Sequence, residues 1–213
     1  DVYNTAVGYN AGQQVTTGFY NTLVGGLAGD ALTDSDYNVA LGFNALSAET
    51  LGGYNTAIGC YALDAQNSTS ATVTYNTAVG YSAGSAVTTG TASTFIGANA
   101  GDAITSGINN TAVGAFALSA DTLGKFSVAV GNGALERQNF TTATNAYNTA
   151  VGYDAGSRIS AGTQNTLIGS LAGDAITDAD YNTVVGVAAL GSNVLGSRNT
   201  ALGSFALASQ TFT

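Results

Sequence analysis

The chain of 213 residues contains no histidine, proline, methionine or tryptophan, and only one cysteine. Because histidine and cysteine are common general bases, nucleophiles and zinc ligands, their scarcity excludes a histidine-based catalytic centre, a Cys–His pair and a Cys/His zinc cluster. A single cysteine also provides no disulfide framework. We therefore expect a protein that is not an enzyme, with no catalytic residues, no cofactor and no metal site.

Charge is scarce and one-sided, with four basic residues against thirteen acidic ones and a net charge of −9. Binding to nucleic acid through phosphate contacts needs a basic surface, so a nucleic-acid partner is not expected. No apolar run approaches the ~20 residues that a membrane span needs, and no secretory or transit segment is visible. Because position 1 is not methionine, we expect the sequence to be a segment of a longer or processed chain.

What the chain does contain is a short repeat rich in glycine, which supplies 29 residues. A motif related to Asn-Thr-Ala-Val-Gly occurs twelve times with a 17-residue spacing, as from Asn4 to Asn21, and with a 21-residue step after every fourth copy, as from Asn55 to Asn76. Four copies make a 72-residue super-repeat, and the three super-repeats cover positions 1–72, 73–144 and 145–213. We predict that residues 1–213 form a single segment of a longer fibre.

The repeat favours a parallel β-roll over a helical array. The fifth motif position is glycine, and the fourth is valine, isoleucine or leucine, in all twelve copies. Small and β-branched residues in alternation are typical of a strand, and glycine at a fixed position suits a backbone that bends or approaches another backbone closely. Seventeen residues are too few for a repeat that carries a helix. The sequence predicts an all-β fold, a parallel β-roll or β-solenoid of about twelve 17-residue coils.

The first motif position predicts a structural ladder of asparagines. Stacked asparagine side chains can bond to one another and to the backbone of successive coils, which offsets the cost of burying them. This role is favoured over direct contact with a ligand. The ladder consists of Asn4, Asn21, Asn38, Asn55, Asn76, Asn110, Asn148, Asn165, Asn182 and Asn199, with serine at the two remaining positions.

Alternation along each strand suggests which residues face the interior. The aliphatic fourth position is uniformly large, so we expect it to fill the coil, while alanine and glycine face outward as a flat strip. In the second coil of each super-repeat the alanine becomes large, at Leu23, Phe95 and Leu167. Because outward apolar residues at a fixed spacing suit a contact between subunits, we predict that these three lie at the interface of a homo-oligomer.

The four extra residues of each long coil form candidate contact loops. Gln66, Gln138 and Gln210 occupy equivalent places, and Ser- and Thr-rich tips follow them. Asn67 and Asn139 lie in Asn-x-Ser/Thr patterns. The loops are either insertions tolerated at a surface edge or a periodic site for a receptor or for glycosylation.

Two more columns leave alternatives open. Tyrosines before the motif could stack on sugar rings or on one another, and stacking on one another is favoured because other residues interrupt the column. Aspartates such as Asp34 and Asp36 are favoured as solvated turn residues over calcium ligands, because the middle super-repeat has Ser106 and Ile108 there. A threonine column at the second motif position is also what an ice-binding surface needs.

Units such as NTAVGYNAG…TTG and NTAIGCYAL resemble the repeats of trimeric autotransporter adhesin heads. They are still more similar to the 17-residue repeats of phage tail fibres and of bacterial surface proteins with tail-fibre domains. The resemblance covers essentially the whole chain. It implies a left-handed parallel β-roll, three rolls packed about a common axis, and a rod that presents an adhesive surface. Typical adhesin-head units are shorter, so no matrix-binding residues are carried over.

These features predict a structural and adhesive segment of an extracellular fibre, as a surface adhesin or filament. The segment would form a stiff homo-oligomeric rod, with a trimer favoured and other closed multiples open, for attachment to cells or surfaces. The expected partners are further copies of the chain and a receptor on a host or prey cell surface, a glycan or a matrix protein. The alternatives are the receptor-binding shaft of a phage tail fibre and an ice-binding β-solenoid. The expected location is extracellular, on a cell surface or a virion fibre.

Overall fold

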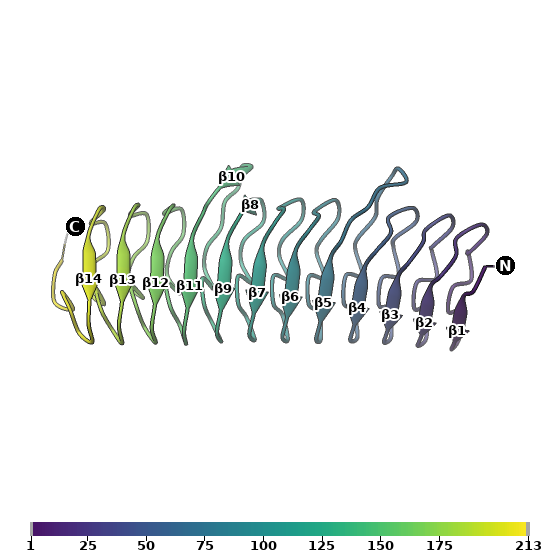
Figure 1. Cartoon of the computed structure of the whole chain (residues 1–213), viewed down its shortest axis with the longest axis horizontal. Helices are drawn as coiled ribbons and strands as arrows, with labels where there is room; N and C mark the ends of the chain where they lie inside the picture. Colours follow the sequence, from purple (N-terminus) through teal and green to yellow (C-terminus); the bar gives the residue numbers. More distant parts are fainter. Residues whose placement is uncertain (1, 212–213) are drawn as a thin grey trace. The chain divides into compact units, whose positions relative to one another are not determined.

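A computed structural model describes residues 2–211. It confirms the all-β fold, a parallel β-solenoid of about 12 turns with a 17-residue spacing and no helix among the described residues. The turns divide into two compact units, Asp1–Ile108 and Asn109–Thr213, with six main strands in each. Figure 1 labels these strands along the chain. The boundary between the units falls inside the second super-repeat, so it does not follow the 72-residue period.

The first unit contains six three-residue strands that pair in parallel in chain order. They are β1 (Thr5–Val7), β2 (Thr22–Val24), β3 (Val39–Leu41), β4 (Thr56–Ile58), β5 (Thr77–Val79) and β6 (Thr94–Ile96). Equivalent motif positions lie opposite each other, such as Thr5 and Thr22. The 21-residue step keeps this register, with Thr56 opposite Thr77, so its extra residues leave the ladder as a loop.

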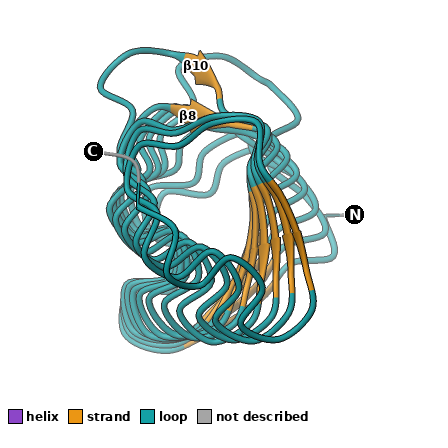
Figure 2. Cartoon of the chain, turned by 90° about the vertical axis from the view of Figure 1, so that its left-hand side faces the viewer, coloured by secondary structure: helices purple, strands orange, loops and turns teal. Residues whose placement is uncertain are grey.

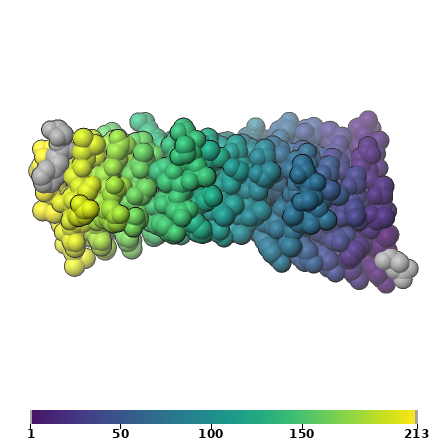
Figure 3. Space-filling view, turned by 90° about the horizontal axis from the view of Figure 1, so that it is seen from above, coloured from purple at the N-terminus to yellow at the C-terminus, as the bar shows by residue number. Residues whose placement is uncertain are grey.

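The second unit repeats this arrangement. Its main strands, paired in parallel in this order, are β7 (Thr111–Val113), β9 (Val128–Val130), β11 (Thr149–Val151), β12 (Thr166–Ile168), β13 (Thr183–Val185) and β14 (Thr200–Leu202). A separate parallel pair, β8 (Gly124–Lys125) and β10 (Thr144–Asn145), accompanies the long coil. Figure 2 shows the main strands gathered on one side of the turns, with β8 and β10 apart from them. Within each unit, every turn packs against the turns before and after it in sequence (Figure 3).

Glycine follows every main strand because successive turns approach too closely there for a side chain. The twelve glycines at this position have φ between 116° and 140°, a region that other residues rarely adopt. A Cβ atom on Gly59 would overlap the carbonyl group of Gly80 in the next turn. Close stacking of the backbone therefore requires this glycine column.

The strands face the opposite way from the expectation. Their middle residues point inward, and Ala40, Ala57 and Ala78 are completely buried, while the aliphatic fourth position faces outward. The asparagine column decides this orientation. Asn38 is buried, and Ala40, two residues later, shares its face of the strand. The expectation that the aliphatic column fills the coil is therefore wrong.

Leu23, Phe95 and Leu167 are core residues, so their assignment to a subunit interface is wrong. They are the inward middle residues of β2, β6 and β12 and are at most 1% exposed. Each fills space that glycine leaves in the opposite wall of the turn: a Cβ atom on Gly84 or Gly101 would overlap the Phe95 ring. A fully buried side chain cannot contact another subunit, and the 72-residue recurrence reflects core packing.

We predict that Phe95→Ala lowers the free energy of unfolding by about 3–5 kcal/mol, because it removes buried apolar surface and leaves a cavity. Urea denaturation followed by circular dichroism measures the change. Phe116→Ala is the matched control, since Phe116 is 48% exposed and its truncation should change the free energy by only about 0.5 kcal/mol. Equal losses in the two variants would contradict the core position of Phe95.

Candidate functional site

The outward side of the main strands, which we call the outer strand face, carries two parallel columns. Threonine dominates one column, and aliphatic residues form the other. Leu41, Ile96 and Ile168 in the aliphatic column are 44%, 39% and 40% exposed. Large apolar residues aligned in this way on a surface are typical of a contact site. The aliphatic column is Val7, Val24, Leu41, Ile58, Val79 and Ile96 in the first unit and Val113, Val130, Val151, Ile168, Val185 and Leu202 in the second.

The asparagine column forms a hydrogen-bonded ladder inside the turns. Oδ1 of Asn21 accepts from the backbone N–H of Asn38 at 3.0 Å, and Oδ1 of Asn38 accepts from that of Asn55 at 2.9 Å. The side-chain nitrogen of Asn21 donates to the carbonyl oxygen of Ser35 at 2.7 Å. The second unit has the same contacts. Each asparagine therefore ties neighbouring turns together, which is a structural role.

Two of the glutamines assigned to contact loops lie buried beneath those loops. Gln66 and Gln138 are 0% exposed. Nε2 of Gln66 donates to Oε2 of Glu49 at 2.8 Å, and Nε2 of Gln138 donates to Oδ2 of Asp121 at 2.7 Å. Their carbonyl oxygens accept from asparagines of the ladder. The prediction that these two glutamines contact a receptor is wrong, because their position in the turn points inward.

Two buried acids, which the sequence did not lead us to expect, hold the long coils in place. Oε1 of Glu49 accepts from the backbone N–H of Ser68 at 3.0 Å, and Oδ1 of Asp121 accepts from that of Phe140 at 3.1 Å. Both acids are 0% exposed. Each lies one 17-residue turn before its partner glutamine, in the same column of the repeat. That spacing was the available signal for a buried acid–amide pair.

The asparagines of the contact loops do lie at the surface. Asn67 and Asn139 are exposed, and each Oδ1 atom accepts from a threonine hydroxyl at 3.1 Å, of Thr50 and Thr122 respectively. Gln210, the counterpart of the buried glutamines in the last turn, is half-buried. Its Oε1 atom has no hydrogen-bond partner within residues 2–211.

Several aspartates are partly shielded from water instead of fully solvated. The Oδ1 atoms of Asp30 and Asp102 are buried and have no hydrogen-bond partner in the described part of the chain. Desolvation raises the pKa of these two carboxyls, and it also raises the pKa of Asp64, Asp121 and Asp174. Over residues 2–211, no three His, Cys, Asp or Glu side chains gather in a way that could hold a metal ion.

The tyrosine column of the first unit stacks on itself. The ring centroids of Tyr20 and Tyr37 are 5.1 Å apart, and those of Tyr37 and Tyr54 are 4.7 Å apart, with nearly parallel rings in both pairs. Tyr75, which follows the long coil, is tilted by 49° from Tyr54. Parallel rings cover each other's faces, whereas a tilted ring leaves one face of Tyr54 less covered.

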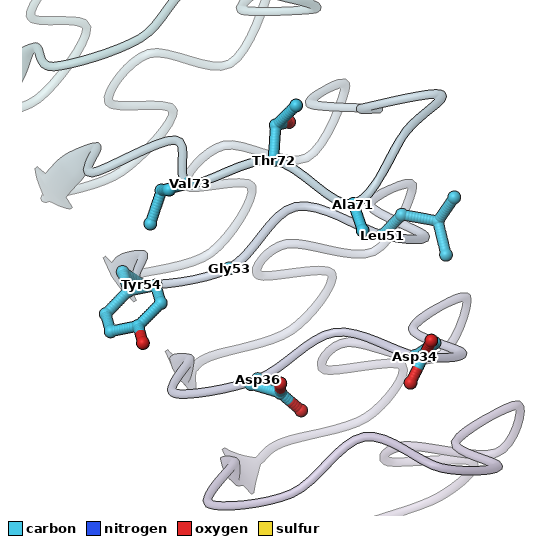
Figure 4. Close-up of a pocket in the computed structure, with 8 residues that line it drawn as sticks. All are labelled: Asp34, Asp36, Leu51, Gly53, Tyr54, Ala71, Thr72 and Val73. Atoms are coloured by element: carbon cyan, nitrogen blue, oxygen red, sulfur yellow. The ribbon is translucent and has the colours of Figure 1, made fainter.

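A cavity of about 190 Å³, which we call the Tyr54 cavity, lies beside this ring (Figure 4). Residues of three consecutive turns form its wall, and Gly53 belongs to the middle one of these turns. The lining residues are Asp34, Asp36, Leu51, Gly53, Tyr54, Ala71, Thr72 and Val73.

A scan against protein-family models, a search of curated proteins and a search of solved structures each found no match to this chain. In the described residues 2–211, no helix is long and apolar enough to cross a membrane. The outer strand face and the Tyr54 cavity are the two surface features that bear on function.

We predict that the protein loses stability as the pH rises from about 4 towards 7. In the unfolded chain, Asp30, Asp102 and Asp121 titrate near the ordinary aspartate pKa of 3.8. In the fold, desolvation raises the pKa of all three carboxyls. The folded state therefore binds more protons than the unfolded state at pH values between the unfolded pKa and the higher folded pKa. The stabilisation is complete below the unfolded pKa and is lost as the pH rises through the folded pKa. Thermal denaturation at a series of pH values measures this trend.

Asp102→Asn tests the physical cause, because it removes the charge from a carboxylate with a buried, unpartnered oxygen in the described residues. It should raise Tm at pH 7 by about 2–4 °C and reduce the slope of Tm against pH. Asp178→Asn is the control, since Asp178 is exposed. A Tm that is unaffected by Asp102→Asn at pH 7 would contradict the role of desolvation.

Proposed function

We propose that the chain is a structural and adhesive segment of an extracellular fibre, and that it assembles as a stiff homo-oligomeric rod. The observation that carries this proposal is the outer strand face, whose aliphatic column is exposed or half-buried along consecutive parallel strands in each unit. Such a column would be covered by another chain in an assembly. The aliphatic column, and not the buried residues Leu23, Phe95 and Leu167, then forms the contact between subunits.

A further copy of the same chain is the partner that fits this face best. Parallel strands are spaced by roughly 4.7–4.9 Å, so a second copy presents aliphatic residues at the same levels as the first. A closed arrangement about a common axis lets every copy bury its column. Three copies are favoured by the resemblance to trimeric fibres.

The interior of the turns supports a stiff fibre. Within each unit, backbone hydrogen bonds and the asparagine ladder join each turn to the next, so stability accumulates turn by turn as in other solenoids. A rod of this kind holds repeated weak binding sites on a surface, where avidity exceeds the affinity of one site. No catalytic role is part of this proposal.

The threonine column favours one second candidate, an ice-binding surface. The structure places Thr56 and Thr77 on the outward side of a parallel sheet, beside the aliphatic column. Ten of the twelve positions are threonine, and Val39 and Val128 occupy the others. Thermal hysteresis of the monomer in a freezing solution distinguishes this candidate from a fibre.

We predict that static light scattering gives a mass near three chains of 21.0 kDa over a range of concentrations. Ile96→Asp or Ile168→Asp should shift the mass towards one chain with an unchanged circular dichroism spectrum, because each places a charge in the aliphatic column. Leu195→Asp is the matched control, since Leu195 is 48% exposed but lies outside the main strands.

Either of two results would overturn the fibre proposal. One is a mass of a single chain at every concentration. The other is an oligomer whose mass responds to Leu195→Asp and to Ile96→Asp equally. A monomer with thermal hysteresis would establish the ice-binding candidate in its place.

A further inference from the structure

The Tyr54 cavity interrupts the regular surface of the first unit. One wall comes from Asp34 and Asp36, the opposite wall from residues 71–73 of the long coil, and Gly53 and Tyr54 lie between them (Figure 4). A volume of about 190 Å³ is small for a drug-sized ligand and suits a single ring.

Residues 72–74, where the long coil rejoins the regular turns, are held beside Gly53 and form one wall of this cavity. The backbone N–H of Gly53 donates to the carbonyl oxygen of Thr72 at 3.0 Å, and the carbonyl oxygen of Gly53 accepts from the N–H of Thr74 at 3.1 Å. Gly53 thereby forms a parallel bridge with Val73. The loop is held beside Gly53. A Cβ atom on Gly53 would lie 2.7 Å from the carbonyl oxygen of Asp36, so the glycine lets the turn of Asp36 approach closely on the other side.

The carboxylates of the cavity can accept hydrogen bonds from a ligand. Oδ1 of Asp34 accepts from the Thr17 hydroxyl at 2.5 Å, and Oδ1 of Asp36 accepts from the Phe19 N–H at 2.9 Å. The second oxygen of each carboxylate makes no hydrogen bond within residues 2–211. Hydroxyl groups donate short and strong hydrogen bonds to such oxygens.

Tyr54 adds an apolar surface to these acceptors. Tyr37 covers one face of its ring at a centroid distance of 4.7 Å, and the tilted Tyr75 lies 5.5 Å away on the other side. The side chain is nevertheless 46% exposed, so the edge of the ring supplies the apolar surface. A ligand with an apolar ring face and a rim of hydroxyl groups matches an aromatic ring beside two carboxylates.

A second hollow lies on the other side of the same loop and is lined by hydroxyl groups. Its volume is about 330 Å³. It shares Thr72 and Val73 with the Tyr54 cavity, so a ligand longer than one ring can contact both. Its remaining lining residues are Ser68, Thr69, Ser70, Thr89 and Thr91.

Charge excludes acidic ligands from this surface. All four basic residues, Lys125, Arg137, Arg158 and Arg198, belong to the second unit. The first unit contains seven acidic residues and no basic one. A sulfated or sialylated ligand would therefore meet only repulsion near Asp34 and Asp36.

We propose that the Tyr54 cavity binds one sugar ring of an uncharged oligosaccharide, whose next ring lies over the hydroxyl-lined hollow. The sugar hydroxyls donate to Asp34 and Asp36, and the apolar face of the sugar ring packs against the exposed edge of the Tyr54 ring. This inference rests on the proposed attachment function and gives it a ligand class.

The two acids, the glycine and the tyrosine of this site occur together once in the sequence. The residues one super-repeat after Asp34, Asp36 and Gly53 are Ser106, Ile108 and Lys125, so the second super-repeat lacks the acids and the glycine. The third super-repeat keeps the acids as Asp178 and Asp180 but has Ser197 and Arg198 in place of Gly53 and Tyr54. The chain thus provides matched control positions for the two acids, and Tyr181 is a control from the same tyrosine column.

The test uses the whole chain on a glycan array that displays neutral, sialylated and sulfated oligosaccharides, followed by calorimetric titration with the strongest neutral binder. Tyr54→Ala and the double variant Asp34→Ser with Asp36→Ile should each lower the affinity on the order of tenfold or more. Ala92 occupies the tyrosine column at φ 55°, so alanine fits this backbone conformation. The controls, Tyr181→Ala and the double variant Asp178→Ser with Asp180→Ile, should leave the affinity within about twofold.

Three results would overturn the inference: no neutral oligosaccharide binds, only acidic ones bind, or the first-unit variants bind as well as their controls. Light scattering on the same samples separates this failure from failure of the fibre proposal. An oligomer that binds no neutral sugar rejects the site and keeps the fibre. A monomer whose binding depends on Tyr54 keeps the site and rejects the fibre.

Discussion

Everything in this fold depends on the hydrogen-bonded stacking of turns in an unchanging register. Each main strand is only three residues long, so it is stable only between neighbours that repeat it. Glycine at the fifth motif position allows the backbones to approach, as the overlap of a Cβ on Gly59 with Gly80 demonstrates. Within each unit, the asparagine ladder adds side-chain bonds from one turn to the backbone of the next, such as that between Asn21 and Asn38.

The small interior of a turn then determines which large residues are allowed. A large middle residue such as Leu23 is accommodated where Gly12 and Gly29 line the turn. In the turn of Ala40, where the middle residue is alanine, the position equivalent to Gly29 is the buried Leu46. A large side chain on one wall of a turn thus lies opposite a small residue on the other wall. This packing keeps the turns similar in size, so that they can stack.

The two proposed functional surfaces lie where the repeat presents a regular face and where it is interrupted. The regular outer strand face suits assembly, because a second copy has the same periodicity. The long coil breaks that periodicity, and buried acids such as Glu49 hold its first residues by accepting from Ser68. Its returning end, beside Gly53, then opens the Tyr54 cavity. The proposed assembly contact and the proposed sugar site therefore arise from different properties of the same repeat.

The amino-acid sequence by itself determined the fold class, the 17-residue turns and the asparagine column, because these follow from spacing and composition along the chain. It did not decide which strand face is inward, since alternation in a three-residue strand is compatible with two opposite orientations. The tertiary structure decided this, because Asn38 must lie inside to bond the next turn and Ala40 lies on the same side. Contacts between turns likewise decided that Phe95 and Gln66 are buried and that a cavity forms beside Tyr54. These properties depend on residues of neighbouring turns, which are brought together only when the turns stack.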